Sequence, residues 1–209
     1  LGALVGDPAC ALDEKLTLEV NLMATRLVAE VAKANKVQRL IFASTCSVYG
    51  ANDEILDEHS KTAPVSLYAK SKVASERVLS KLKDDTFSPV IVRFGTIYGF
   101  SGRTRFDLVV NLLTAKAIVD CEITLYGGEQ WRPFLHVEDA ARASIDAINN
   151  EFKNESVVLT GQEPMKVTDM LKMLSEILEL PAGSVEFTEE RNAGHYVRTP
   201  YSYQPKLGK

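Results

Sequence analysis

The sequence predicts an α/β fold built on a doubly wound parallel sheet, because helical patterns alternate with short, continuously apolar runs. Such runs, at 38–45 (QRLIFAST) and 89–99 (PVIVRFGTIYG), are typical of strands that are buried on both faces of a parallel sheet. Helical patterns precede and separate them at 13–35 and 66–83. Right-handed crossovers place such helices on both faces of the sheet, and ligands bind at the carboxyl ends of the strands.

The first helical stretch, 13–35, is predicted to be amphipathic and to pack on the core. Its apolar residues recur at spacings of three and four: Leu16, Val20, Met23, Leu27 and Val31. The second stretch, 66–83, follows a polar loop that begins after residue 50.

A smaller α/β lobe is expected beyond Gly99, where a turn rich in Gly, Arg and Ser ends the apolar run. The expected elements are a helix near 107–118, strands at 123–128, 132–137 and 156–161, and helices at 137–150 and 168–180. The helix at 137–150 carries Ala140, Ala141, Ile145 and Ile148 on one face. Thr168 is the expected N-cap of the last helix.

Composition excludes several classes of protein. A net charge of −4 with interspersed charges does not supply the concentrated basic surface that nucleic acid requires. No apolar run approaches the ~20 residues of a membrane helix, and no signal peptide is recognisable, so we expect a soluble, cytoplasmic protein. Cys10, Cys46 and Cys121 lack the pattern of a disulfide set or a metal site, which suits a reducing compartment and implies no metal.

Tyr68 and Lys72 form a Tyr-x-x-x-Lys pattern within the predicted helix 66–83. Residues four apart share one face of a helix, so the phenol and the ammonium can face one site. A cation within ~4 to 6 Å favours the phenolate and makes a tyrosine, whose ordinary pKa is about 10, a usable acid or base. The pattern by itself is also typical of a half-buried helix tyrosine beside a solvated lysine.

Hydroxyl side chains gather at 44–50 (STCSVYG), where the strand 38–45 is expected to end. Thr45 can donate a hydrogen bond to the substrate oxygen that Tyr68 protonates or deprotonates; the alternative is a Ser/Thr turn that caps the next segment. Cys46 has no histidine near it in the sequence, so we interpret it as a pocket lining rather than a nucleophile. His136 is interpreted as a packed polar residue.

With these features the chain resembles the extended short-chain dehydrogenase/reductase family, in its NAD-dependent nucleotide-sugar epimerase and dehydratase branch. The resemblance covers nearly the whole chain and rests on segments that follow the family's order: NLMATRLVAEVAK with Asn21, FASTCSVYG, YAKSK, VRFGTIYG and EQWRPFLHVEDAARA. It implies a Rossmann-like sheet, truncated at its N-terminus. Residues 1–99 would be the C-terminal part of an NAD-binding domain, and 100–209 mainly a substrate-binding lobe interleaved with returning Rossmann elements.

The resemblance also implies roles for individual residues. Tyr68 looks like the acid/base, Lys72 like its pKa-lowering, ribose-binding lysine, and Thr45 like the active hydroxyl. Contacts to the cofactor would come from Leu1, Gly2, Ala3, Asn21, Tyr68, Lys72 and the backbone at Gly95. Contacts to the nucleotide sugar would come from Thr45, Thr96, Arg132 and Arg191.

Arg132 stands where the family's arginine grips the nucleotide diphosphate, a role that suits a forked guanidinium. The alternative for Arg132 is a strand-edge salt bridge, and Arg198 is an alternative to Arg191. Many relatives carry asparagine where this chain has Thr96, so the identity of the sugar stays open.

The implied reaction is epimerisation of a nucleotide sugar by transient oxidation of a sugar hydroxyl, with NAD as cofactor and NADP as an alternative. Dehydratases of this branch carry an Asp-Glu pair directly after the active hydroxyl, where this chain has Cys46 and Ser47, so that chemistry is disfavoured. One competing hypothesis is an NADPH-dependent keto-sugar or steroid-type reductase. Another is a non-catalytic relative that senses a dinucleotide or serves as an interaction module.

The resemblance further implies a homodimer formed through helices 13–35 and 66–83.

The chain opens on Leu1 rather than Met and closes abruptly at Lys209, so we expect segments to be missing at both ends. The family's Gly-rich turn between a strand and a helix is absent. Gly2 and Gly6 do not replace it, because no strand precedes them and no helix pattern follows them directly. We therefore expect this chain alone to bind NAD poorly or not at all.

Overall fold

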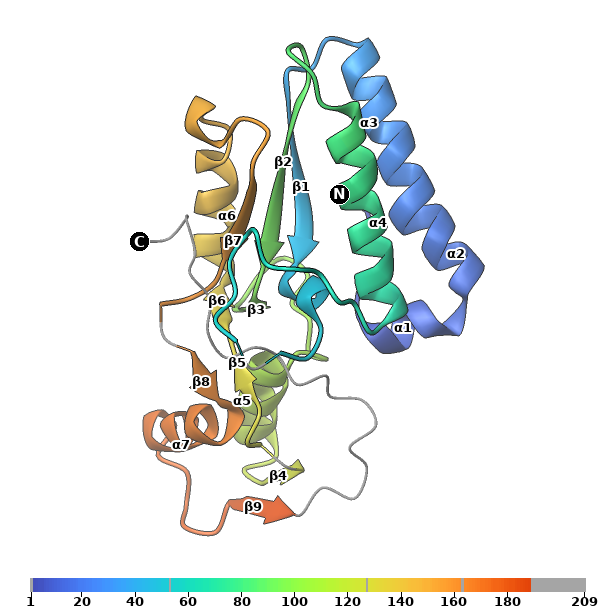
Figure 1. Ribbon diagram of the computed structural model, residues 1–209. Coiled ribbons are helices and arrows are strands. Elements are labelled where there is room, and N and C mark those ends of the chain that lie inside the picture. The colour runs from blue at the N-terminus through green and yellow to red at the C-terminus, as the bar shows by residue number, and fades with distance from the viewer. Residues whose placement is uncertain (1, 53, 127, 163, 189–209) are drawn as a thin grey trace.

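A parallel sheet with helices on both of its faces forms the upper part of the computed structural model (Figure 1). The structure describes residues 2–52, 54–126, 128–162 and 164–188. The helical elements are α1 (Asp7–Leu12), α2 (Glu14–Leu18), η1 (Glu19–Met23), α3 (Ala24–Ala34), η2 (Cys46–Tyr49), α4 (Leu67–Leu82), α5 (Val109–Val119), α6 (Val137–Asp146), η3 (Asn150–Phe152) and α7 (Val167–Ile177). The strands are β1 (Arg39–Thr45), β2 (Ser88–Phe94), β3 (Thr96–Tyr98), β4 (Ile123–Tyr126), β5 (Trp131–Arg132), β6 (Phe134–His136), β7 (Ser156–Leu159), β8 (Met165–Lys166) and β9 (Val185–Thr188).

The main sheet has the order β1-β2-β7, and every pairing in it is parallel. Its register places Thr45 beside Phe94 and Phe94 beside Leu159, so the carboxyl ends of the strands meet at one edge. Helices α3 and α4 lie on one side of this sheet and α6 lies on the other (Figure 1). The predicted α/β class with parallel strands and helices on both faces is confirmed.

Strand β2 is buried on both faces, which explains its continuously apolar sequence. On the side of α3 and α4, the core consists of Ala29, Phe42, Leu79, Phe87 and Ile91. On the side of α6, the core consists of Val90, Val92, Leu135, Ala140, Ala143, Ala147, Val157 and Leu159.

Two expectations about the later helices are wrong. The face of α6 that meets the sheet runs through Ala140, Ala143 and Ala147, whereas Ile145 and Ile148 are exposed, because the small alanines allow the helix to approach closely. Helix α7 begins at Val167 with Lys166 as its N-cap, so Thr168 is not the cap. Lys166 belongs to β8, and its extended backbone supplies the non-helical residue that a helix start needs.

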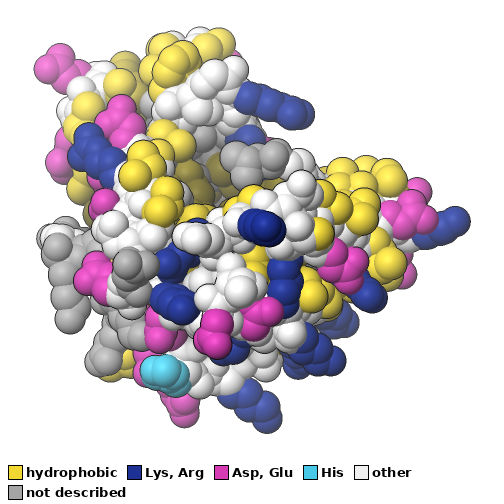
Figure 2. All heavy atoms as spheres, turned by 90° about the horizontal axis from the view of Figure 1, so that it is seen from above, with side chains coloured by type: hydrophobic (Ala, Val, Ile, Leu, Met, Phe, Trp, Pro, Cys, Tyr) yellow, Lys and Arg dark blue, Asp and Glu magenta, His cyan; other side chains and the backbone are white. Residues whose placement is uncertain are grey.

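The predicted helix 13–35 is present as α2, η1 and α3 in succession, with a π-helical turn in its middle. Its apolar stripe does not pack on the core as expected: Leu16, Met23, Leu27 and Val31 are between 44% and 60% exposed, and only Val20 is half-buried. Thr17, Asn21 and Ala29 are buried instead, because the polar and small face turns inward. Figure 2 shows hydrophobic side chains at the surface on its right-hand side, where these helices lie in Figure 1.

The smaller lobe lies below the main sheet in Figure 1 and has a core of its own. It contains the parallel pair β4–β9 and the antiparallel pair β5–β8. The buried residues of this core are Leu113, Ala117, Ile123, Leu125, Val167, Met170 and Leu171. Strand β7 and helix α6 return to the main sheet, while the domain boundary between residues 99 and 100 stays a prediction.

In the part of the chain that the structure describes, no helix is long and apolar enough to cross a membrane.

Candidate active site

Thr45 and Tyr68 meet at the carboxyl end of the main sheet. Thr45 is the last residue of β1, and Tyr68 lies in the first turn of α4. Ser66 caps that helix, since its hydroxyl accepts the amide of Ala69 at 3.2 Å, and so fixes where the helix begins. The Thr45 side chain lies near enough to the Tyr68 phenol to lower its pKa by hydrogen bonding, although burial outweighs this effect.

Lys72 lies one turn further along the same face of α4, as the sequence predicts. Its Nζ donates to the carbonyl of Ala43 at 2.9 Å and lies 5.7 Å from the centroid of the Tyr68 ring. The Phe42 ring is 4.9 Å from the same nitrogen. Burial lowers the pKa of Lys72, and the thiol of Cys10 and the carboxylate of Glu76 oppose that shift. The ammonium is therefore held in a fixed place beside the tyrosine.

The pKa of Tyr68 differs from the expected one. It is raised to about 12, mainly by burial and next by the Cys10 thiol, instead of being lowered by Lys72. Among the positive charges, Arg105 opposes this rise most. A phenol with this pKa is protonated at neutral pH, so in this structure Tyr68 is poised to donate a proton. Acting as a base would require further positive charge nearby.

Arg105 is a residue of this site that the sequence reasoning missed. It follows the turn 100–104, and its Nε lies 3.0 Å from Oδ1 of Asp107. A side-chain carbon added at Gly6 would lie 3.4 Å from its Nη2, so the guanidinium reaches the N-terminal segment. No local pattern signals this approach, because it arises from the folding of the chain after β3 back toward α1.

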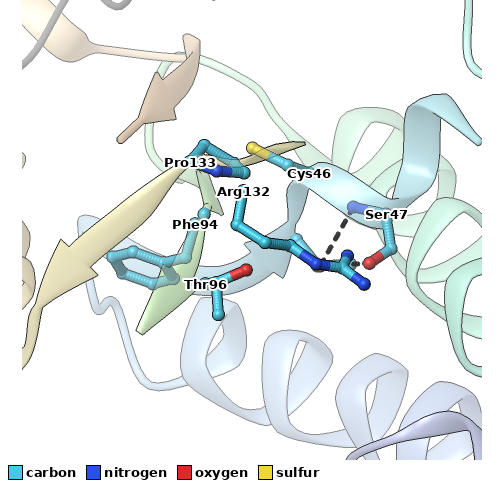
Figure 3. A pocket seen from close by; sticks show the side chains of 8 residues that line it. Cys46, Ser47, Phe94, Thr96, Arg132 and Pro133 are labelled. Carbon is cyan, nitrogen blue, oxygen red and sulfur yellow. Dashed lines mark hydrogen bonds between the residues drawn. The ribbon is translucent and has the colours of Figure 1, made fainter. Parts of the chain in front are cut away.

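A shallow hollow opens beside Thr45, and Figure 3 shows the side chains that line it. The lining residues are Thr45, Cys46, Ser47, Phe94, Gly95, Thr96, Arg132 and Pro133. Thr45 Oγ1 accepts the amide of Ser47 at 3.1 Å and donates to its hydroxyl at 3.1 Å. The side chain of Arg132 extends toward Ser47 (Figure 3). The hollow has a volume of about 50 Å³, far smaller than the 300–1,000 Å³ typical of complete ligand pockets.

Gly95 permits the approach that brings Arg132 to Thr45. The amide of Thr96 donates to the carbonyl of Pro133 at 2.8 Å, and the amide of Gly95 donates to Leu159 at 2.9 Å. A Cβ at position 95 would lie 2.3 Å from the Pro133 carbonyl oxygen, which no side chain tolerates. The predicted substrate residues Thr45, Thr96 and Arg132 thus lie together with Gly95 around one hollow.

Asn21 is buried in the π-helical turn, and its amide is engaged with the N-terminal segment. Oδ1 accepts the amide of Leu4 at 2.9 Å, and Nδ2 donates to the carbonyl of Leu4 at 2.9 Å. Ser75 of α4 donates to the backbone carbonyl of Asn21 at 2.9 Å. Asn21 therefore holds the segment that includes Gly2 and Ala3 next to α4, and π-helical turns often occur at functional sites.

The remaining predicted residues have other surroundings or lie outside the described residues. The Cys46 thiol is buried, donates to the Arg93 carbonyl at 3.4 Å and borders the hollow. His136 accepts the amide of Glu138 at 3.4 Å and packs edge-on against Tyr98, as expected of a packed polar residue. Leu1, Arg191 and Arg198 lie outside the described residues. Within the described ranges, no cluster of His, Cys, Asp or Glu side chains could hold a metal ion.

Comparison with known proteins decides the family. The sequence model of the NAD dependent epimerase/dehydratase family matches residues 1–160, which is more than half of the chain. The chain belongs to this family. Its members are enzymes, and the match includes β1 with Thr45, α4 with Tyr68 and Lys72, and Gly95 between β2 and β3.

Curated relatives agree with the NAD-dependent epimerase/dehydratase assignment. An uncharacterised UDP-glucose epimerase, YtcB of Bacillus subtilis, is 26% identical over 160 residues, which cover 75% of this chain and 50% of that protein. The UDP-glucuronate 4-epimerase of Thermodesulfobacterium geofontis is 27% identical over 185 residues, which cover 85% of this chain and 55% of that protein. The chain thus spans about half the length of the curated relatives it matches.

Solved structures of epimerases and dehydratases have the same fold. The UDP-glucuronic acid 4-epimerase of Bacillus cereus, in complex with UDP-glucuronic acid and NAD, matches with a TM-score of 0.83 and 24% identity over 99% of this chain and 65% of that chain. The dTDP-glucose 4,6-dehydratase DesIV of Streptomyces venezuelae, with NAD bound, matches with a TM-score of 0.84 and 22% identity over 98% of this chain and 63% of that chain.

Proposed function

We propose that the complete protein containing this chain is an NAD-dependent nucleotide-sugar epimerase in which Tyr68 is the acid/base. The observation that carries the proposal is the placement of Thr45 and the Tyr68 phenol near one another at the carboxyl end of the sheet, with Lys72 on the same helix face. Both solved neighbours described above contain NAD, and one contains a nucleotide sugar.

The residues of this chain account for the proton transfers. As the phenolate, Tyr68 removes the proton of a sugar hydroxyl while Thr45 donates a hydrogen bond to the same oxygen; as the phenol, it later returns the proton. Arg105 favours the phenolate against the burial that raises its pKa, and we propose that Lys72, whose ammonium lies 5.7 Å from the centroid of the Tyr68 ring, adds to this positive charge during the reaction. NAD, when bound, supplies the oxidation and reduction of the sugar carbon.

Arg132 is proposed to bind the diphosphate of the substrate. It extends into the hollow beside Thr45 and Ser47, and its planar guanidinium matches phosphate oxygens in a forked geometry. Ser47 stands where a dehydratase would need a carboxylate for elimination, and a hydroxyl of ordinary acidity does not supply that base. Epimerisation is therefore favoured over dehydration.

The described residues fit the nicotinamide half of NAD. Ala43, whose carbonyl accepts from Lys72, is exposed in the middle of a strand, and Gly2 and Ala3 are exposed in the segment held by Asn21. Small residues at these positions leave room for a ligand. The ammonium of Lys72 has three donors, of which Ala43 takes one, and ribose hydroxyls suit the others. The pyrophosphate half requires a Gly-rich turn, which this sequence does not contain.

A homodimer is proposed through the exposed stripe on α2, η1 and α3, together with α4. Four residues of the stripe, Leu16, Met23, Leu27 and Val31, are exposed in the single chain, and so is the neighbouring Val28. Large contiguous apolar surface of this kind marks an interaction face.

We also propose that the protein is cytoplasmic, since its three cysteines are unpaired thiols, which a reducing compartment maintains.

The test is turnover by the complete gene product that contains this chain. It is incubated with NAD and, separately, with UDP-glucose, UDP-glucuronic acid and dTDP-glucose, and the sugar products are identified by NMR. The proposal expects an epimer of at least one substrate, with no net consumption of NAD. A keto sugar lacking the elements of water would indicate a dehydratase, and turnover only with NADPH and a keto sugar would indicate a reductase. Binding of neither ligand class would contradict an enzymatic function.

A further inference from the structure

A buried ion pair lies directly behind the proposed catalytic residues. Arg93 of β2 and Glu76 of α4 have side chains only 8% and 7% exposed. Their contact is forked: Arg93 Nη2 donates to Glu76 Oε2 at 2.7 Å, and Nε donates to Oε1 at 3.1 Å. Such a pair joins a helix to a strand with a defined orientation as well as a defined distance.

The same carboxylate also holds the strand that ends in Thr45. Ser44, the residue before Thr45, donates to Glu76 Oε1 at 2.5 Å. Tyr68, Lys72 and Glu76 are spaced four apart on α4, so they lie on successive turns of one face. They contact Thr45, the Ala43 carbonyl and Ser44 respectively. Glu76 is therefore the third attachment of this helix face to the end of β1.

Arg93 extends the attachment to the segment that follows Thr45. Its Nη1 donates to the Tyr49 hydroxyl at 2.8 Å and to the Glu58 carbonyl at 3.1 Å. The Tyr49 hydroxyl in turn donates to the Asp57 carbonyl at 2.7 Å. Because η2 starts from Thr45 and ends at Tyr49, the guanidinium fixes the far end of the turn that shapes the hollow.

A role in stability alone explains this arrangement poorly. Two charges removed from water are often no better for stability than apolar side chains of similar volume, because desolvation offsets their attraction. What they add is a unique geometry, since every donor has its acceptor in one arrangement. We propose that Glu76 and Arg93 are positioning residues, whose buried pair fixes α4, with Tyr68 and Lys72, against the strand end that carries Thr45.

The expected effect on kcat rests on the proposed function, whereas the expected effect on hydrogen exchange does not. The experiment therefore measures both. The main variant replaces the pair by apolar residues, Glu76→Met with Arg93→Met, and adds Ser44→Ala so that the Ser44 hydroxyl is not left without its acceptor. The Tyr49 hydroxyl loses Arg93 as a donor but keeps its own bond to the Asp57 carbonyl. The matched control is Arg77→Gln, an exposed position on the same helix. Urea unfolding measures global stability, and hydrogen exchange by mass spectrometry measures local opening of 42–50 and 66–76.

A positioning role predicts that the apolar variant unfolds near the wild-type urea midpoint while both segments exchange about tenfold faster, because the local attachment is lost. In the complete protein, kcat falls about 10²-fold with KM nearly unchanged, which is the effect of a misplacement of about 1 Å. Exchange and kcat that both match the wild-type values would overturn the proposal. If the wild-type complete protein shows no turnover, the proposed function fails, and hydrogen exchange still decides the positioning role.

Should the apolar variant fail to fold, Glu76→Asp decides in its place. It keeps the charge and shortens the reach by one methylene, so it opens the contact to Ser44 or to Arg93. Faster exchange in 42–50 with the urea midpoint largely kept supports the positioning role. Exchange equal to that of the Arg77→Gln control would overturn it.

Discussion

Lys72 donates to the backbone carbonyl of Ala43 at 2.9 Å while its ammonium stands 5.7 Å from the centroid of the Tyr68 ring. The lysine is thus anchored to the strand and presents its charge to the tyrosine from a fixed position. A backbone carbonyl cannot move away by changing rotamer, so the anchor is stiffer than one made by a side chain.

Replacing Lys72 tests this anchoring. Lys72→Met removes the charge and the donor at similar volume, and we expect turnover of the complete protein to fall about 10²- to 10⁴-fold, the range for an acid/base group that loses its support. Lys72→Arg keeps the charge but not the compact ammonium, so it should restore little. Steady-state kinetics measure both; the exposed Lys70→Met serves as control, and an equal loss there would contradict the specific role.

The raised pKa of Tyr68 makes stability depend on alkaline pH. The phenol has a pKa of about 12 in the folded chain and about 10 when unfolded, so the folded state binds its proton more tightly. The resulting stabilisation is complete below pH 10 and is lost as pH rises from 10 through 12. Urea unfolding of this chain should therefore show stability falling over that window, and Tyr68→Phe should fall less steeply. Identical slopes would mean that burial does not raise this pKa.

Gly95 should tolerate no side chain, because a Cβ there meets the Pro133 carbonyl oxygen at 2.3 Å. We expect Gly95→Ala to reduce the free energy of unfolding by about 1–3 kcal/mol, the usual cost of overpacking, and to weaken nucleotide-sugar binding by displacing Arg132. Gly102→Ala is the matched control, since nothing lies within 4 Å of its added carbon. Equal stability of the two variants would show that the backbone approach at Gly95 is dispensable.

The exposed stripe on α3 predicts the oligomeric state. If it forms the proposed homodimer, Leu27→Asp should convert a dimer into a monomer in analytical ultracentrifugation, because an unpaired carboxylate is costly to bury at an apolar interface. Ile145→Asp, at an equally exposed apolar position on α6, should leave the dimer intact. A wild-type monomer at micromolar concentration would contradict the dimer.

The sequence was sufficient for features that depend on local pattern. The continuous apolar runs predicted β1 and β2, although the run at 89–99 divides at Gly95 into β2 and β3, and β3 pairs with β6 instead of the main sheet. The spacing of four between Tyr68 and Lys72 correctly placed both on one face of α4. The direction of the apolar stripe on α2 to α3 could not be inferred, because a pattern of three and four identifies an apolar face without saying what covers it. The pKa of Tyr68 was also misjudged, since burial is a property of the folded chain and outweighs a lysine four residues away.

Residues brought together by long-range folding were the least predictable. Arg105 reaches the active site only because the chain beyond β3 folds back toward α1, and Glu76 meets Arg93 only because α4 packs on the sheet. Arg105 and Glu76 lie outside the motifs that the sequence analysis used, and although Arg93 lies within VRFGTIYG, that segment does not reveal its partner. The Ser/Thr cluster at the end of β1, in contrast, was predictable because ligands of parallel sheets gather at the carboxyl ends of the strands.

The most direct test of the central claim is to separate binding from turnover at Tyr68. Calorimetry of the complete protein and of its Tyr68→Phe variant with NAD and with the nucleotide sugar measures binding, and product analysis measures epimerisation. The account predicts that Tyr68→Phe binds both ligands with affinities close to the wild-type values while its turnover falls by about 10²-fold or more. Turnover that survives Tyr68→Phe undiminished would contradict the claim that this phenol is the acid/base.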